Sequence, residues 1–357
     1  MFNSFPTWSV LLIYAVLAAG IVFFSKKLAD YVDALDKKTK ISGAFIGAVL
    51  LAAVTSLPEL FTSISATMLI PEGSGMVIGN ILGSNLFNLA IIGVALILFF
   101  RLFAKSKLAY KTQYIVIVAC LLIYGIIAYG ILAPESAQPI VGPFNFICLL
   151  IIVVYGIAIF LEPKNKEEGA EEKEDPMKNL TVKQVGIRFA IFALLLVAVS
   201  IFITYATDAI ANQIFDGDTT IAGAIFLAVA TSLPELTSTF VLCKKGNFDA
   251  ALGDITGSCL FNFLIISLGE IFNAISASYF AGTISILSGY DMGKYFGALV
   301  MLICTCVVLL VLGAILLINQ KSQQKEKPES KARYGIYISA GVIITAGYIV
   351  FLVLTNI

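Results

Sequence analysis

The chain has 357 residues, of which 59% are hydrophobic and only 13% are charged, and its mean hydropathy is +0.96. In a soluble domain about a quarter of the residues are charged. This composition therefore excludes a soluble protein and indicates an integral membrane protein. Basic and acidic residues balance at 23 each, which gives no indication of a nucleic-acid partner. The chain has no histidine, which excludes histidine proton relays, zinc sites and catalytic pairs.

Ten apolar segments, each close to or above the length that crosses a bilayer, follow one another along the chain. They lie at about residues 9–25, 42–69, 76–100, 112–133, 143–162, 186–206, 220–243, 249–272, 295–319 and 334–355. The fold class that we expect is therefore an all-α integral membrane protein with ten transmembrane helices. No soluble domain is expected, because the longest polar stretch is too short to bury a core.

Basic residues fall in every second connection between these segments, and the other connections have none apart from Lys294. The basic connections carry Lys26 to Lys40, Arg101 to Lys111, Lys164 to Arg188, Lys244 and Lys245, and Lys321 to Arg333. Cytoplasmic connections are enriched in Lys and Arg, so this alternation places both termini outside. We expect a multi-pass protein of the cell (plasma) membrane of a prokaryote.

Two halves of five segments each are separated by an acidic linker. The boundaries are 1–162 for the first half, 163–185 for the linker and 186–357 for the second half. The acidic run of the linker could bind a regulatory cation, although a solvated cytoplasmic linker is the favoured interpretation. The six cysteines all fall inside predicted spans and are interpreted as packing residues.

The two halves contain the same two sequence blocks. Residues 47–60 (GAVLLAAVTSLPEL) and 223–236 (GAIFLAVATSLPEL) are identical at ten of fourteen positions, and 79–88 (GNILGSNLFN) and 253–262 (GDITGSCLFN) at seven of ten. Such self-similarity indicates an internal duplication. Because five spans is an odd number, the second half enters the membrane from the opposite side. The repeats are therefore predicted to be inverted, with a site near the bilayer midplane.

The first block of each half places a glutamate, Glu59 or Glu235, inside an apolar stretch, directly after a proline. A carboxylate in the bilayer core costs roughly 2.5–3.5 kcal/mol, and no Lys or Arg in the matching spans could neutralise it. Pro58 and Pro234 are expected to kink the helices and to free the carbonyls of Val54 and Ala230.

Hydroxyl side chains lie within one turn of each predicted kink. They are Thr55, Ser56, Thr231 and Ser232. Carboxylate, hydroxyl and carbonyl oxygens in one place are ligands for a hard cation such as Ca²⁺ or Na⁺. The alternative for the hydroxyls is hydrogen bonding to their own backbone, but this alternative does not account for the glutamates.

The second block contributes glycines and further polar side chains. The glycines recur four residues apart, a spacing that lets membrane helices approach closely, and are interpreted as packing residues. They are Gly79, Gly83, Gly253 and Gly257. Two Ser–Asn pairs, also four residues apart, either offer oxygens to the same cavity or join helices by hydrogen bonds. They are Ser84 with Asn88 and Ser258 with Asn262.

These blocks resemble the cation/calcium antiporters, of which the sodium/calcium exchangers are the best-known branch. The resemblance covers essentially the whole chain: ten spans, two inverted halves, TSLPEL twice and G-x-x-x-G-S-x-x-x-N twice. It implies a central site that faces the two sides of the membrane alternately. The implied metal ligands are Glu59, Glu235, Thr55, Ser56, Thr231, Ser232, Ser84, Asn88, Ser258, Asn262 and the carbonyls of Ala52 and Ala228.

The second repeat departs from the sodium branch, which commonly has an aspartate where this chain has Asn262. Asp254 replaces the Asn80 of the first repeat, and Cys259 replaces Asn85. Two carboxylates balance one Ca²⁺ or two monovalent ions, whereas three Na⁺ would favour a third carboxylate. Asp254 lies one turn before Ser258 and is a candidate for that third ligand; it could equally be a helix-entry residue near water.

The expected function is secondary active transport, not catalysis: Ca²⁺ is exchanged for Na⁺ by alternating access. H⁺ is the runner-up counter-ion, supported by Asn262, and K⁺ remains a further co-substrate to test. A passive cation channel and an intramembrane protease are the weaker alternatives, and no P-loop is present for ATP drive. Small inorganic cations and the lipid bilayer are the expected partners, with no cofactor and no obligatory protein partner.

Overall fold

The computed structural model describes residues 2, 4–69, 74–106, 108–133, 135–142, 144–163, 177–214, 228–276, 285, 292–324 and 331–354. Nearly all of this chain is helical. The helices are α1 (Thr7–Lys38), α2 (Gly43–Phe45), the π-helix η1 (Ile46–Leu51), α3 (Ala52–Thr55), α4 (Leu57–Leu69), α5 (Ser74–Lys105), α6 (Tyr110–Leu132), the 3₁₀-helix η2 (Glu135–Ala137), α7 (Ile147–Leu161), α8 (Val182–Ile214), α10 (Ala228–Lys244), α11 (Phe248–Ser276), α12 (Met292–Gln324) and α13 (Lys331–Leu354). A two-residue antiparallel hairpin, β1 (Ile140–Val141) and β2 (Phe144–Asn145), pairs Ile140 with Asn145.

Within the described residues, seven helices are long and apolar enough to cross a membrane. The bent pair 43–55 and 57–64 makes an eighth if it is counted as one span. Helix α7, with 15 residues, and α10, with 17, are shorter. The chain is thus a helical membrane protein, as its composition predicts, whereas the number of ten spans stays a prediction.

Several boundaries differ from those expected from hydropathy. Helix α1 continues to Lys38, well beyond the predicted end at residue 25, because its polar extension still buries one face, including Leu28, Tyr31 and Val32. The segment predicted to be helical from residue 143 first forms the hairpin, in which Gly142 has a φ of 60°, and becomes helical at Ile147. Residues 220–227 and most of the predicted linker, 164–176, lie outside the described residues.

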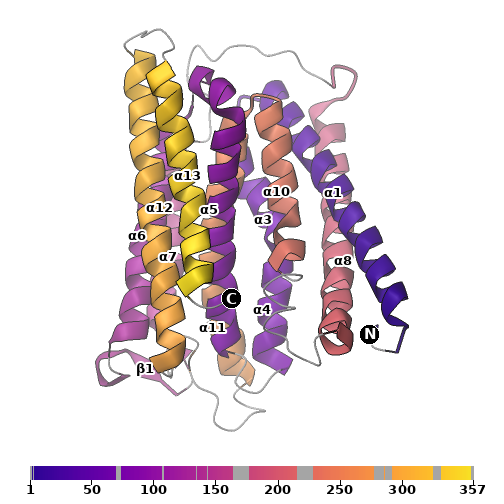
Figure 1. Ribbon diagram of the computed structural model, residues 1–357, viewed down its shortest axis with the longest axis vertical. Coiled ribbons are helices and arrows are strands. Elements are labelled where there is room, and N and C mark those ends of the chain that lie inside the picture. The colour runs from indigo at the N-terminus through magenta and orange to yellow at the C-terminus, as the bar shows by residue number, and fades with distance from the viewer. Residues whose placement is uncertain are drawn as a thin grey trace.

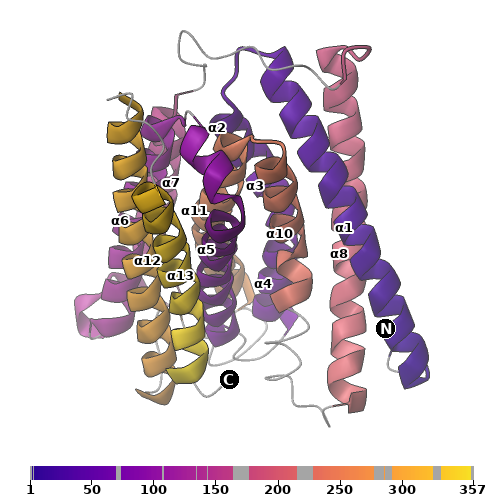
Figure 2. The ribbon, with the colours of Figure 1, turned by 45° about the horizontal axis from the view of Figure 1, so that its top comes forward.

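The helices form a bundle with two distinct edges (Figure 1). Helices α1 and α8 lie side by side at one edge, and α6, α7, α12 and α13 lie toward the other (Figures 1 and 2). The helices that carry the two sequence blocks, α3, α4, α5, α10 and α11, occupy the middle and pack against one another. The first turn of α1 and the last turn of α13 lie toward the same end of the bundle (Figures 1 and 2).

Glycines bring the backbones of α2 and η1 directly against α11. A Cβ atom at Gly257 would lie 2.3 Å from the Ala48 carbonyl oxygen, and one at Gly253 would lie 2.4 Å from that of Ala44. Small residues allow this approach of membrane helices, so the packing role predicted for these two glycines is confirmed. Gly83 is less crowded, with only the Met301 sulfur at 4.0 Å, and the surroundings of Gly79 are outside the described part.

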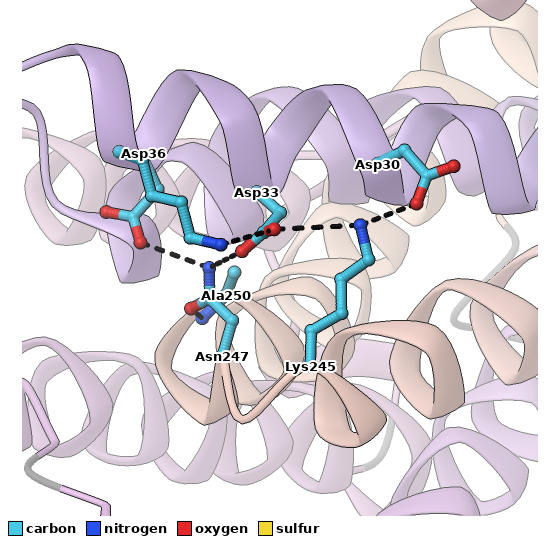
Figure 3. A network of polar contacts seen from close by, with 7 residues as sticks. Asp30, Asp33, Asp36, Lys245, Asn247 and Ala250 are labelled. Carbon is cyan, nitrogen blue, oxygen red and sulfur yellow. Dashed lines mark hydrogen bonds and ion pairs between the residues drawn. The ribbon is translucent and has the colours of Figure 1, made fainter. Parts of the chain in front are cut away.

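A polar cluster joins α1 to the turn between α10 and α11 (Figure 3). Lys245 pairs with Asp30 at 2.5 Å, and Asn247 Nδ2 donates to Asp33 Oδ1 at 3.1 Å and to Asp36 Oδ2 at 3.0 Å. Asn247 also caps α11, since its Oδ1 accepts the Ala250 N–H at 3.3 Å. The side chain of Asn247 therefore ties the start of a site-bearing helix to α1.

Replacement of Asn247 tests whether its contacts between α1 and the start of α11 stabilise the protein. We expect Asn247→Ala to destabilise the protein by about 2 kcal/mol, because it removes a helix cap and two hydrogen bonds to carboxylates. Asn247→Ser keeps the capping oxygen and should lose only part of this stability. Thermal unfolding in detergent measures both variants, and an Asn247→Ala variant as stable as the wild type would contradict the interpretation.

Candidate functional site

The first-repeat helix is broken beside its glutamate, as the proline predicts. Ser56 leaves the helical conformation, with φ −89° and ψ 4°, and the segments on either side of it meet at 40°. Pro58 has no N–H to donate to the Val54 carbonyl, as predicted, and the Ser56 N–H approaches that oxygen while bonding the Ala52 carbonyl at 3.0 Å. The backbone at the break thus keeps a local hydrogen bond at Ser56. Ser56 and Glu59 both lie in the protein interior.

The second-repeat helix behaves differently at the equivalent proline. Helix α10 runs from Ala228 to Lys244 through Pro234 without a break. Thr231, Ser232 and Glu235 are all buried on it. Ala228 is its first residue, and the surroundings of its side chain lie outside the described part. The two repeats, similar in sequence, therefore differ in backbone at their shared proline.

The predicted ligand side chains are buried, but Ser84, Asn88 and Ser232 have no hydrogen bond to the glutamates among the described contacts. Glu59 is 1% exposed and Glu235 is fully buried. The other buried members are Ala52, Thr55, Ser56, Ser84, Asn88, Thr231, Ser232, Asp254, Ser258 and Asn262. Burial alone would also suit interhelical hydrogen bonding, so the contacts between these groups decide what the arrangement can do.

Each glutamate is approached by a hydroxyl of the other repeat. The Ser56 hydroxyl donates to Glu235 Oε1 at 3.4 Å, and the Thr231 hydroxyl lies beside the Glu59 carboxylate. The contact is reciprocal, because Ser56 and Thr231 come from opposite halves of the chain. The two first blocks therefore meet around a shared pair of carboxylates.

Asp254 lies in the same polar interior and is not a helix-entry residue near water. It is fully buried, its Oδ1 accepts from the Thr55 hydroxyl at 3.4 Å, and its Oδ2 accepts from Ser238. Thr55 also lies 3.3 Å from the Ser258 hydroxyl. Asp254 thus links side chains of α3, α10 and α11.

The charges in this interior are of one sign. Glu235 is close enough to Glu59 and Asp254 for their negative charges to repel it. Among the described residues, no Lys or Arg forms an ion pair with any of these three carboxylates. Buried carboxylates without a cation are unfavourable, so the arrangement is suited to a bound cation or to protonation.

Four buried oxygens of the predicted ligand residues have no hydrogen-bond donor among the described residues. They are Glu59 Oε2, Glu235 Oε2, Asn88 Oδ1 and Asn262 Oδ1. Leaving a buried acceptor unsatisfied costs roughly 1–3 kcal/mol, and such groups need an explanation. In the described chain no three acidic or cysteine side chains are grouped to hold a metal ion by themselves. Neutral oxygens would therefore have to complete a coordination shell around the glutamates.

The Ala52 carbonyl, predicted as a ligand, accepts the Ser56 N–H at 3.0 Å. The Thr55 hydroxyl lies 3.3 Å from the same oxygen, but its single proton is donated either there or to Asp254 Oδ1. When Thr55 donates to Asp254, the second lone pair of the Ala52 oxygen is open to a cation. Its role as a ligand stays a prediction.

Sequence reasoning missed three residues of this interior, Ser238, Asn85 and Tyr124. Ser238 follows Glu235 by three residues on the same helix, a spacing that could have indicated it. Asn85 lies inside the second block, and its Oδ1 accepts a hydrogen bond from Asn262 Nδ2 at 2.8 Å. Tyr124, on α6, lies 3.3 Å from Asn85 Nδ2 and carries no sequence signal.

The fold and the buried acidic interior define a class, a polytopic helical membrane protein with an internal site suited to cations. Residues 9–162 and 185–356 match the family of the sodium/calcium exchanger protein. This match spans most of the chain, and the chain belongs to that family. Its members are transporters, not catalysts.

Individual relatives and solved structures agree with this membership. The sodium/calcium exchanger MaX1 of Methanosarcina acetivorans is 28% identical over 302 residues, covering 74% of this chain and 84% of MaX1. The putative antiporter CaxA of Alkalimonas amylolytica is 28% identical over 244 residues, 67% of this chain and 73% of CaxA.

Two solved structures share the fold. The sodium-calcium exchanger NCX_Mj aligns with a TM-score of 0.66 at 20% identity, over 97% of this chain and 99% of that one. The H⁺/Ca²⁺ exchanger CAX aligns with a TM-score of 0.63 at 17% identity, over 97% and 90% of the two chains. The same architecture therefore occurs in exchangers with different counter-ions.

Stability in the presence of a cation tests the site directly. We expect Ca²⁺ to raise the thermal unfolding temperature of the purified protein, because a ligand at one hundred times its Kd adds about 2.7 kcal/mol. Glu59→Gln and Glu235→Gln should each abolish this stabilisation, whereas Ser267→Ala, which changes a buried α11 hydroxyl bonded to the Cys148 carbonyl, should keep it. Equal Ca²⁺ stabilisation of both glutamine variants would contradict the assignment.

Proposed function

We propose that this protein is an antiporter that exchanges Ca²⁺ for Na⁺ across the membrane by alternating access at a central site. The observation that carries the proposal is the pair of buried glutamates, one from each repeat, with an unpartnered oxygen on each. Family membership and the similarity to the sodium/calcium exchanger MaX1 support Ca²⁺ as substrate.

The proposed ligand set is the one expected from the sequence. Glu59 and Glu235 supply charge, and neutral oxygens complete the shell. These come from Thr55, Ser56, Ser84, Asn88, Thr231, Ser232, Ser258, Asn262 and the carbonyls of Ala52 and Ala228. Asp254 is proposed as a third carboxylate at the edge of this set, which its contacts with Thr55 and Ser238 support.

Electrostatics supplies the coupling between the two ions. Without a cation, the charges of Glu59, Glu235 and Asp254 repel one another in a medium that screens them poorly. Either Ca²⁺ or monovalent ions relieve this repulsion, so a loaded site can turn from one side of the membrane to the other while an empty one resists. Exchange follows, because the ions compete for the same oxygens.

The proposed counter-ion is Na⁺, with H⁺ as the second candidate. Na⁺ is favoured because three carboxylates could accompany more than one Na⁺ and because MaX1 is a sodium/calcium exchanger. H⁺ is the second candidate, since Asn262 replaces a carboxylate and the H⁺/Ca²⁺ exchanger CAX has the same fold. A passive channel is disfavoured by the fully buried glutamate Glu235.

We further propose ten transmembrane helices in two inverted repeats, with both termini outside the cell membrane. Equivalent residues of inverted repeats are expected to meet at their two-fold axis, where each contacts the other reciprocally. Asn85 and Cys259, equivalent in the second blocks, do so: Asn85 Nδ2 donates to the Cys259 carbonyl at 3.2 Å, and Cys259 Sγ lies 3.7 Å from the Asn85 carbonyl. This contact supports a two-fold relation between the repeats, and the odd number of predicted spans in each half supplies the inversion.

Transport into proteoliposomes tests the function. Vesicles loaded with Na⁺ should take up ⁴⁵Ca²⁺, and Glu235→Gln should abolish uptake because it removes one of the two charges that balance Ca²⁺. Uptake driven only by a pH gradient would replace Na⁺ by H⁺ in the proposal. The absence of uptake in Na⁺-loaded, K⁺-containing and pH-gradient vesicles would contradict Ca²⁺ exchange.

A further inference from the structure

Asn85 occupies the buried contact between α5 and α11 and makes three hydrogen bonds there. Its Nδ2 donates to the Cys259 carbonyl at 3.2 Å and lies 3.3 Å from the Tyr124 hydroxyl. Its Oδ1 accepts from Asn262 Nδ2 at 2.8 Å. Asn85 is fully buried, so no water competes for these bonds.

The chemistry of the partners fixes which way both amides point. A backbone carbonyl only accepts, so the Asn85 atom that faces Cys259 must be the NH₂ group. The other end of the Asn85 amide is then its oxygen, which faces Asn262 and requires a donor. Asn262 must therefore present its own NH₂ group to Asn85, and its carbonyl oxygen points elsewhere.

The remaining oxygen of Asn262 is free to bind a cation. Asn262 Oδ1 is buried and has no donor among the described residues. We propose that Asn85 is a positioning residue that holds the Asn262 amide with its oxygen directed at the transported cation. This inference rests on the proposed function, because it takes Asn262 as a ligand of that cation.

The same geometry favours an amide over a carboxylate at position 262. An aspartate there would bring an acceptor against Asn85 Oδ1, and two acceptors facing each other in a buried site are unfavourable. Asn85 cannot turn to relieve the clash without directing its oxygen at the Cys259 carbonyl. The Asn85 contact therefore selects a neutral oxygen ligand at a position where the sodium branch commonly has an acidic one.

A double-mutant cycle with Asn85→Ala, Asn262→Ala and the double variant tests this role. The measurements are the equilibrium Ca²⁺ Kd in detergent, and KM and kcat for Ca²⁺/Ca²⁺ exchange in proteoliposomes, which require no counter-ion. We expect Asn85→Ala to raise Kd and KM about 3- to 10-fold, the effect of one lost hydrogen bond, with kcat changed less than about 2-fold. In the Asn262→Ala background, the same substitution should change Kd less than about 2-fold.

Controls separate this inference from the proposed function. Asn319→Ala deletes another buried asparagine, which accepts from the Tyr337 hydroxyl at 2.9 Å, and should leave the Ca²⁺ Kd unchanged. If Asn262→Ala itself leaves Kd unchanged, Asn262 is not a ligand and that part of the proposed function fails. If Asn262→Ala weakens binding but Asn85→Ala has no effect, or an equal effect in both backgrounds, the positioning role is overturned. Asn85→Ser, equally too short to reach Asn262, replaces Asn85→Ala if that variant does not fold.

Discussion

The structure depends on two buried carboxylates that no Lys or Arg of the described chain neutralises. Glu59 and Glu235 come from different halves, yet a hydroxyl of the opposite half approaches each of them. Buried charges of one sign would push these helices apart in a low-dielectric interior. A cation between them would turn this repulsion into attraction, so the arrangement that is unfavourable in the empty protein would favour cation binding.

Close backbone packing keeps these charges together. Gly253 and Gly257 let α11 lie directly on η1, just before the break that turns Ser56 and Glu59 inward. The α1 cluster fastens the start of α11 from outside through Asn247. The position of Asp254, between Thr55 and Ser238, follows from this register of α11 on the first repeat.

Much of this arrangement could be predicted from the sequence, and the exceptions have physical reasons. The twin glutamates and the break near Pro58 follow from residues whose local chemistry is strong. The unbroken course of α10 through Pro234 could not be predicted. The same motif lies in a broken helix in the first repeat and in a continuous helix in the second, so packing around the motif decides between them. The roles of Asn85 and Tyr124 depend on contacts between α5, α6 and α11, which no local pattern encodes. The hairpin before α7 was also not predicted, because its apolar residues resemble the start of a membrane-spanning helix.

Anomalous diffraction from crystals soaked in Sr²⁺, a scattering substitute for Ca²⁺, would show whether the two glutamates bind one divalent cation. We expect one dominant peak within about 2.7 Å of carboxylate oxygens of both Glu59 and Glu235, the range of a hard divalent cation with oxygen ligands. The peak should disappear in Glu235→Gln crystals. A dominant peak remote from both glutamates, or one that persists in that variant, would show that they do not share a cation.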